Sequence, residues 1–163
     1  MNIVFDAMMF AREVHKDQVR KYTSNPYVDH LAEVAGILGT VETNPIAIAT
    51  AWLHDCVEDQ GVTYEVLKEK FGVFVAAGVI WLSDIEEGNR ATRKAASRKR
   101  LNLAPAYVQT IKCADLISNT SSIVKHDPDF AKVYLEEKRL LLDALTFADP
   151  CLRQLAYQQA GAV

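Results

Sequence analysis

The stretch Ala51-Trp52-Leu53-His54-Asp55-Cys56-Val57-Glu58-Asp59 combines apolar residues with one imidazole and three carboxylates. Its apolar residues predict burial, and a buried carboxylate is costly unless it is paired, protonated or bound to a metal ion. On a helix, His54 and Glu58 would share one face at i, i+4, and Asp55 and Asp59 would share the adjacent face. We therefore expect a buried helix on which His54 and Asp55 bind a metal ion, with Glu58 and Asp59 one turn further on, close to a water that the ion binds.

An alternative interpretation of the same stretch needs no metal. His54 would then be a hydrogen-bonded core histidine, and the acidic residues would form a solvated turn at the end of a helix. However, four ionisable groups fall within the six residues from His54 to Asp59, which is a high density for a buried helix. The stretch therefore favours the metal site.

The composition is that of an ordinary globular protein. The chain has 163 residues, of which 50% are apolar and 24% charged, enough for one domain with a substantial core. The net charge of −3 argues against a general nucleic-acid binder. No apolar run approaches the ~20 residues of a membrane span, and the amino terminus lacks the pattern of a signal peptide. We expect a single domain over residues 1–163 in the cytoplasm, with no membrane or nucleic-acid partner, and the sequence leaves open whether it forms a homo-oligomer.

The three cysteines, Cys56, Cys113 and Cys151, are scattered and lie among apolar residues. An odd number of cysteines without metal-binding spacing does not indicate a disulfide framework or a zinc ribbon. We expect all three to be reduced core residues of an intracellular protein.

Helical periodicity and helix-start signals run through most of the chain, and strand-like alternation never exceeds a few residues. Asn2 is available as an N-cap. The pairs Asn44-Pro45, Asp127-Pro128 and Asp149-Pro150 each place proline directly after a capping residue. Gly61 is expected to end the helix that contains the central stretch. The fold class is therefore all-α, a bundle of about seven or eight helices, which include segments over residues 2–19, 73–85, 105–125, 128–147 and 150–160.

Residues 90–100 carry six of the 18 lysines and arginines in the chain. A charge run of this kind is usually a solvated helix face. The alternative is a positive rim that attracts an anionic small molecule.

Three separated pieces of the sequence form a recognisable series. They are Tyr27-Val28-Asp29-His30, then His54-Asp55-x-x-Glu58-Asp59, then Lys112-x-x-Asp115-x-x-x-Asn119. In this order the chain resembles the HD-domain metal-dependent phosphohydrolases, from about residue 6 to about residue 145. The branch it resembles most is the hydrolase domain of Rel/SpoT proteins and their small stand-alone relatives, which cleave guanosine pyrophosphate alarmones. Further agreement lies in His15-Lys16-x-Gln18-x-Arg20-Lys21 ahead of Pro26-Tyr27.

The resemblance implies roles for the residues of these motifs. Two histidines and two aspartates would bind one divalent metal ion, manganese in this branch: His30, His54, Asp55 and Asp115. Glu58 and Asp59 would position and deprotonate the attacking water. A mixed set of nitrogen and oxygen donors suits manganese, iron or zinc better than calcium or magnesium. The chain has no histidine between His54 and Asp115, so a single-metal site is favoured.

The remaining implied residues concern the substrate. Arg20 and Lys21 match the basic pair beside the nucleotide, Asn119 matches a polar substrate contact, and Tyr134 matches a tyrosine late in the family pattern. Lys112 could join Arg20 and Lys21 in neutralising a diphosphate. His15 and His126 are expected at the surface or at helix ends and not as ligands.

The chain departs from the family pattern at several positions near the substrate. Asn25 stands where the branch has threonine, Leu31 where it has proline, and Phe130 where it has a basic residue. Thr120-Ser121 follows Asn119 where the family continues with leucine and arginine. These differences concern the substrate more than the metal or the acidic pair.

Three functional hypotheses follow. The first is hydrolysis of the 3′-pyrophosphate of a guanosine alarmone (ppGpp or pppGpp). The second is the same chemistry on a nucleoside monophosphate, a deoxynucleoside triphosphate or a phosphorylated dinucleotide. The third is a non-catalytic nucleotide sensor, against which the presence of both Glu58 and Asp59 counts, since binding alone does not require them.

Overall fold

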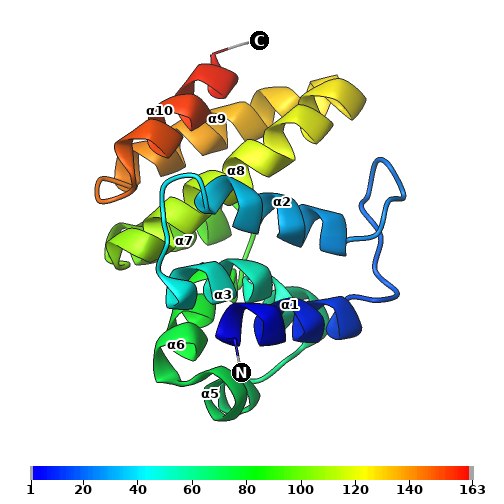
Figure 1. Ribbon diagram of the computed structural model, residues 1–163. Coiled ribbons are helices and arrows are strands. Elements are labelled where there is room, and N and C mark those ends of the chain that lie inside the picture. Colours follow the sequence, from blue (N-terminus) through cyan, green and yellow to red (C-terminus); the bar gives the residue numbers. More distant parts are fainter. Residues whose placement is uncertain (1, 162–163) are drawn as a thin grey trace. The chain divides into compact units, whose positions relative to one another are not determined.

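The computed structural model describes residues 2–161, and their secondary structure is helical apart from one isolated antiparallel bridge between Val19 and Pro26. The predicted all-α class is confirmed (Figure 1). The described part of the chain contains ten helices, slightly more than the seven or eight expected. Contacts along the chain define two compact units, Met1–Ile85 and Glu86–Val163.

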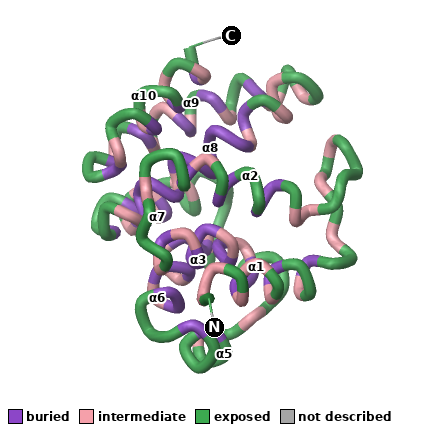
Figure 2. Tube along the Cα trace, in the orientation of Figure 1, coloured by how far each residue is buried: buried purple, intermediate pink, exposed green. Residues whose placement is uncertain are grey.

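Unit 1 is organised around its third helix. Helix α3 packs against α1, α2 and α6, and α1 runs alongside it (Figure 1). Buried alanines along α3, such as Ala47, Ala49 and Ala51, allow these neighbours to approach closely. Figure 2 shows the buried positions of α3 and α6 in purple. The helices of unit 1 are α1 Ile3–Val14, α2 Val28–Leu38, α3 Pro45–Leu53, α4 Cys56–Gln60, α5 Tyr64–Phe71 and α6 Val73–Leu82.

The predicted helix starts of unit 1 are present. The side chain of Asn2 accepts a hydrogen bond from the amide of Val4, and that of Asn44 accepts one from Ile46. Helix α1 ends at Val14, earlier than the predicted residue 19. The chain turns there: the amide of Gln18 donates to the carbonyl of His15 at 3.0 Å, and the amide of Tyr27 donates to the carbonyl of Gln18 at 2.9 Å.

The central stretch is not one continuous helix, and the prediction that it would be is wrong. Helix α3 ends at Leu53 and α4 begins at Cys56. The Nδ1 atom of His54 lies 2.8 Å from the carbonyl oxygen of Ala51, which in an uninterrupted helix would accept the amide of Asp55. The ring of His54 therefore contacts this carbonyl at the point where the helix breaks, between His54 and Asp55. Gly61 ends α4 with φ +66°, as its position predicted.

The described part of unit 2 contains four helices, of which α8, α9 and α10 pack against one another (Figure 1). Asp127 and Asp149 accept hydrogen bonds from the amides of Phe130 and Cys151, which confirms both predicted caps. Among residues 2–161, no helix has both the length and the hydropathy needed to cross a bilayer. The helices are α7 Arg90–Asn102, α8 Ala106–His126, α9 Pro128–Ala144 and α10 Pro150–Ala160.

The basic run lies on α7, and two of its arginines form ion pairs within unit 2. Arg90 pairs with Glu137 at 2.7 Å, and Arg100 pairs with Glu86 at 2.6 Å. Arg90 and Lys99 are exposed. The run is therefore a largely solvated helix face with two anchoring pairs.

Two of the three cysteines are in the core, as predicted. Burial, with the neighbouring Asp55, raises the pKa of Cys56 to about 12, and burial raises the pKa of Cys113 to about 12. Cys151 is exposed, so its predicted place in the core is wrong. It follows Pro150 in the first turn of α10, on the side of that helix that faces water.

Candidate metal centre

The ring of His54 has a defined tautomer. His54 is 3% exposed, and its Nδ1 lies 2.8 Å from the carbonyl oxygen of Ala51. A carbonyl only accepts, so Nδ1 carries the hydrogen and Nε2 presents a lone pair when the ring is neutral. That Nε2 lies 3.0 Å from Oδ2 of Asp55. A nitrogen lone pair and a carboxylate oxygen repel at this distance unless the ring is protonated or a metal ion lies with them, and the second arrangement is that of metal ligands.

His30 joins this pair from the first turn of α2. It is 1% exposed, and its Nε2 lies 3.6 Å from the same Oδ2 of Asp55. The rings of His30 and His54 meet edge to face with centroids 5.4 Å apart, and a nitrogen of each lies within 4.8 Å of the other. Two imidazoles and one carboxylate thus converge within unit 1, and this donor set suits a transition metal.

Tyr27 supports the carboxylate of this group. Its hydroxyl donates to Oδ2 of Asp55 at 2.7 Å, and its ring packs edge to face against His30 at 5.4 Å. Such a bond orients a ligand and tunes its basicity. Tyr27 belongs to the motif Tyr27-Val28-Asp29-His30 but was not among the predicted site residues. Only the proximity of residues 28 positions apart reveals its role.

The acidic pair lies on the short helix α4 and is exposed to water. Oε2 of Glu58 accepts a hydrogen bond from the backbone amide of Asp84 at 2.9 Å. Oδ2 of Asp59 accepts one from Nε2 of Gln18 at 2.8 Å. Each carboxylate is therefore accessible to solvent and oriented by a donor from a distant part of unit 1.

Arg20 and Lys21 lie on the loop between α1 and α2. The backbone closes this loop, because Arg20 donates to the carbonyl of Asn25 at 2.8 Å and accepts from the amide of Ser24 at 3.0 Å. Nζ of Lys21 lies 3.3 Å from the hydroxyl of Tyr22 and 4.9 Å from the centre of its ring. Both basic residues therefore lie on a short loop, closed by backbone hydrogen bonds, that leads directly to Tyr27 and α2.

The third motif lies on α8 in unit 2. Asp115 is 6% exposed, and its two oxygens are bound by the side chains predicted to contact substrate. Nζ of Lys112 lies 2.8 Å from Oδ2, and Nδ2 of Asn119 lies 2.7 Å from Oδ1. These two donors offset the burial of the carboxylate. Tyr134, on α9, contacts α8 through its hydroxyl, which lies 3.5 Å from the carbonyl oxygen of Leu116.

The two histidines not expected as ligands differ from each other. His126 is exposed at the end of α8. His15 caps the end of α1 as expected, but it is buried and its ring stacks on Tyr27 with centroids 5.4 Å apart. Its Nδ1 lies 2.6 Å from Oε1 of Gln18. The motif that contains His15 and Gln18 did not predict a part in the site for either residue.

Comparison with known proteins identifies relatives of this chain. The family model described as HD domain matches residues 7–134. The chain is 35% identical over 136 residues to the guanosine-3′,5′-bis(diphosphate) 3′-pyrophosphohydrolase of Aquifex aeolicus, covering 82% of the chain and 18% of that protein. It is 33% identical over 132 residues to the GTP pyrophosphokinase of Myxococcus xanthus, covering 76% of the chain and 17% of that protein. The chain thus spans about a fifth of the length of these curated relatives.

Solved structures share the fold. One, described as a metazoan ortholog of SpoT that hydrolyzes ppGpp and plays a role in starvation responses, has a TM-score of 0.89 at 23% identity and covers 100% of this chain and 98% of its own. Another, lmo0812 from Listeria monocytogenes, has a TM-score of 0.69 at 17% identity and covers 80% of this chain and 96% of its own. At these identities the similarity establishes the fold.

Proposed function

The chain belongs to the HD domain family, and we propose that it is a metal-dependent phosphohydrolase that removes the 3′-pyrophosphate from the guanosine alarmones ppGpp and pppGpp. The observation that carries this proposal is the convergence of His30, His54 and Asp55, in which the Nε2 lone pair of His54 faces a carboxylate oxygen at 3.0 Å. The substrate is supported by the relatives that are named for this reaction.

We propose that one divalent ion, manganese, is bound by His30, His54, Asp55 and Asp115. Two nitrogen and two oxygen donors suit this ion, and all four residues fall within the segment that the family model matches. When bound, the ion would polarise a phosphate and activate water.

Glu58 is the proposed general base, and Asp59 the proposed partner that orients the water. A carboxylate has about four lone-pair sites, so Glu58 can accept a proton from water while it keeps its bond from the amide of Asp84. The deprotonated water attacks the phosphorus bound to the 3′ oxygen, the bond to that oxygen breaks, and pyrophosphate leaves. The 3′ oxygen takes up a proton and becomes a hydroxyl.

The proposed substrate-binding residues are Arg20, Lys21, Lys112, Asn119 and Tyr134. A guanidinium at position 20 can stack on a purine, and the ammonium of Lys21 can meet a phosphate. One departure from the family pattern has a structural explanation: Thr120 is 3% exposed and contacts Lys138 and the carbonyl of Leu116. That difference serves the core of unit 2.

The same proposal describes a single domain over residues 1–163 that acts in the cytoplasm, in the stringent response, with a nucleotide as its small-molecule partner.

The test is metal analysis followed by a substrate panel on the full chain loaded with Mn²⁺. About one ion per chain should be found, lost in His54→Ala and retained in His126→Ala, which removes an exposed histidine. The loaded protein should release pyrophosphate from ppGpp faster than it hydrolyses nucleoside monophosphates, deoxynucleoside triphosphates or phosphorylated dinucleotides. If the protein hydrolyses one of the other nucleotides faster, that nucleotide would be the substrate in place of ppGpp. Tight binding of a nucleotide without turnover would indicate a sensor. Two ions per chain, or full occupancy in His54→Ala, would contradict the metal assignment.

A further inference from the structure

A small hydrogen-bonded network connects the turn after α1 to the acidic pair. Nδ1 of His15 and Nε2 of Gln60 each lie 2.6 Å from Oε1 of Gln18. Nε2 of Gln18 in turn donates to Oδ2 of Asp59 at 2.8 Å. The network therefore ends on one of the two proposed water-handling carboxylates, although His15 and Gln18 lie more than 40 residues from Asp59 in sequence.

The orientation of the Gln18 amide is determined by the carboxylate of Asp59, which can only accept. If the amide were flipped, its carbonyl would face the carboxylate of Asp59 and its NH₂ group would face that of Gln60. The contact with Asp59 would then be repulsive, and Gln60 would have to flip as well. With the amide as observed, Oε1 accepts, so the Nδ1 atom of His15 must be the donor. His15 is thereby held in one tautomer, and Gln18 can only donate to Asp59.

His15 is itself anchored in the core of unit 1. Its side chain is 1% exposed, its backbone amide donates to Ala11 at 3.0 Å, and its ring stacks on Tyr27 at an interplanar angle of 19°. Among the described residues, its Nε2 is buried without a hydrogen-bond partner. Within the part of the chain that the structure describes, the imidazole therefore forms its side-chain hydrogen bond through Nδ1, to Gln18.

Asp59 differs from His15 because it is exposed. An exposed carboxylate samples several orientations, and one hydrogen bond at the surface adds little to stability. The bond from Gln18 therefore matters mainly for orientation, because it holds Oδ2 of the Asp59 carboxylate in one direction.

We propose that His15 and Gln18 are positioning residues that orient the carboxylate of Asp59 for catalysis, with Gln60 locking the amide between them. The inference rests on the proposed function, because it takes Asp59 to act on the attacking water. Neither residue contacts the reacting atoms. Their effect passes entirely through Asp59.

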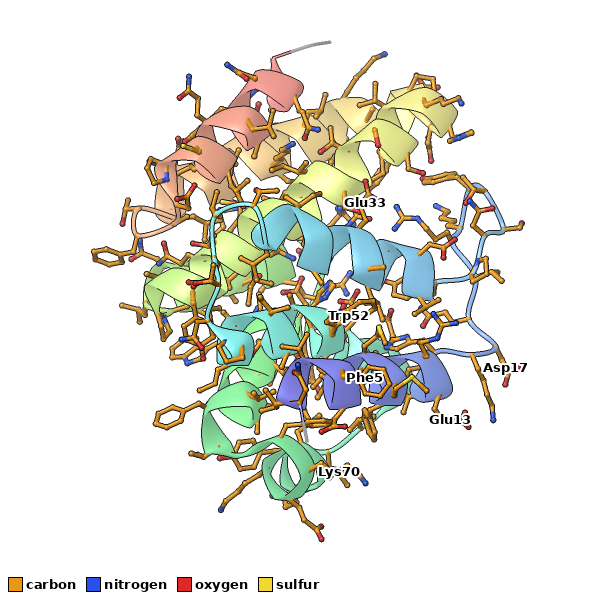
Figure 3. The ribbon with its side chains drawn as sticks, in the orientation of Figure 1. Phe5, Glu13, Asp17, Glu33, Trp52 and Lys70 are labelled. Carbon is orange, nitrogen blue, oxygen red and sulfur yellow. The ribbon has the colours of Figure 1, made fainter. Side chains whose placement is uncertain are left out.

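The first test separates turnover from binding. Gln18→Leu keeps the volume and removes the donor, and it should lower kcat for ppGpp about 10- to 100-fold. The KM and the affinity for Mn²⁺ should stay near the wild-type values, and the melting temperature should fall by about a few degrees, because Nδ1 of the buried His15 loses its acceptor. His15→Phe keeps the stacked ring and should cause a smaller loss of kcat. The control is Asp17→Asn, in the same turn, where Figure 3 shows the side chain at the outer edge; it should behave as wild type.

A double-mutant cycle with Asp59→Ala tests whether the effect passes through Asp59. Adding Gln18→Leu to Asp59→Ala should cause no further loss of kcat. A full additional loss, or a wild-type kcat in Gln18→Leu alone, would overturn the proposal.

A readout without turnover keeps this proposal distinct from the proposed function. Long-range ¹H–¹⁵N NMR of the metal-free protein should show His15 with its proton on Nδ1, and Gln18→Leu should lose that preference. Observation of the Nε2–H tautomer in the wild type would refute the network. If the tautomer is as expected but no nucleotide is hydrolysed, the proposed function fails while the network stands, and its part in catalysis fails with the function.

Discussion

The hydroxyl of Tyr27 donates a hydrogen bond to Oδ2 of Asp55 at 2.7 Å. The same oxygen lies 3.0 Å from Nε2 of His54 and 3.6 Å from Nε2 of His30. One carboxylate oxygen is therefore the point at which a donor from the loop and two imidazoles meet. This places the orientation of Asp55 under the control of a residue that is not itself a proposed ligand.

Removal of this hydroxyl should weaken metal binding. We expect Tyr27→Phe to lower the affinity for Mn²⁺ about 10- to 100-fold, because partners that orient a ligand contribute on this scale. The free energy of unfolding of the metal-free protein should fall by only about 1 kcal/mol. Calorimetric titration with Mn²⁺ measures the affinity, and Tyr22→Phe, in the same loop, is the matched control. Equal affinity in wild type and Tyr27→Phe would show that the bond does not support the metal.

Glu58→Gln tests the proposed general base. The amide has the shape of the carboxylate and can still accept from the amide of Asp84, but it cannot take the proton of water. We expect kcat to fall about 10²- to 10⁴-fold while the metal content and the fold are retained. Steady-state kinetics with ppGpp measure the loss of kcat, and metal analysis of the same sample checks that the metal content is retained. A variant with wild-type turnover would transfer the role of the base to Asp59.

Arg20→Ala tests the contact with the base of the nucleotide. Loss of a stacked guanidinium should raise KM for ppGpp roughly 3- to 30-fold, and hydrolysis of a small generic phosphomonoester, which has no base, should change little. Kinetics on both substrates are compared for wild type, Arg20→Ala and Lys16→Ala, an exposed lysine before the loop. Equal losses on both substrates would mean that Arg20 supports the site itself.

Burial of Lys138 in unit 2 should give the protein a specific pH dependence of stability. The residue is 1% exposed, and Nζ donates to two neutral acceptors, Thr120 at 2.7 Å and Gln159 at 3.0 Å. Burial lowers the pKa of Lys138 from 10.5 to about 8. Between these values the folded chain has released this proton and the unfolded chain retains it, so a rise in pH favours the folded state. Below pH 8 both states are protonated, and the full cost of burying the charge applies.

Urea unfolding of the wild type and Lys138→Met across pH 8–10.5 measures this effect. The free energy of unfolding of the wild type should rise relative to that of the variant by on the order of 1–3 kcal/mol. The comparison with the variant is needed because Cys56 and Cys113 lower the free energy of unfolding as the pH rises. Their thiols ionise near pH 9 in the unfolded chain, and burial raises their pKa to about 12 in the folded chain. Lys132→Met, an exposed change on the same helix, should follow the wild type. A constant difference between wild type and Lys138→Met would contradict the lowered pKa.

The sequence alone determined the helices and most of their starts. Asn44-Pro45, Asp127-Pro128 and Asp149-Pro150 each begin a helix where predicted, because a cap depends on atoms within three residues of one another. Gly61 ends α4 for the same local reason, since it adopts a positive φ. The buried imidazole of His54 within an apolar stretch could also be predicted from composition.

Tertiary structure alone decided how the polar groups are oriented. The helix break at His54-Asp55 coincides with a contact between the His54 ring and the carbonyl of Ala51, and the sequence pattern is the same with or without that contact. The pairing of Tyr27 with Asp55 and of Gln18 with Asp59 joins residues 28 and 41 positions apart. Periodicity describes which face of a helix is apolar within a few turns. The direction of a side chain toward a distant partner depends on how the helices pack, and that packing oriented the carboxylates of Asp55 and Asp59.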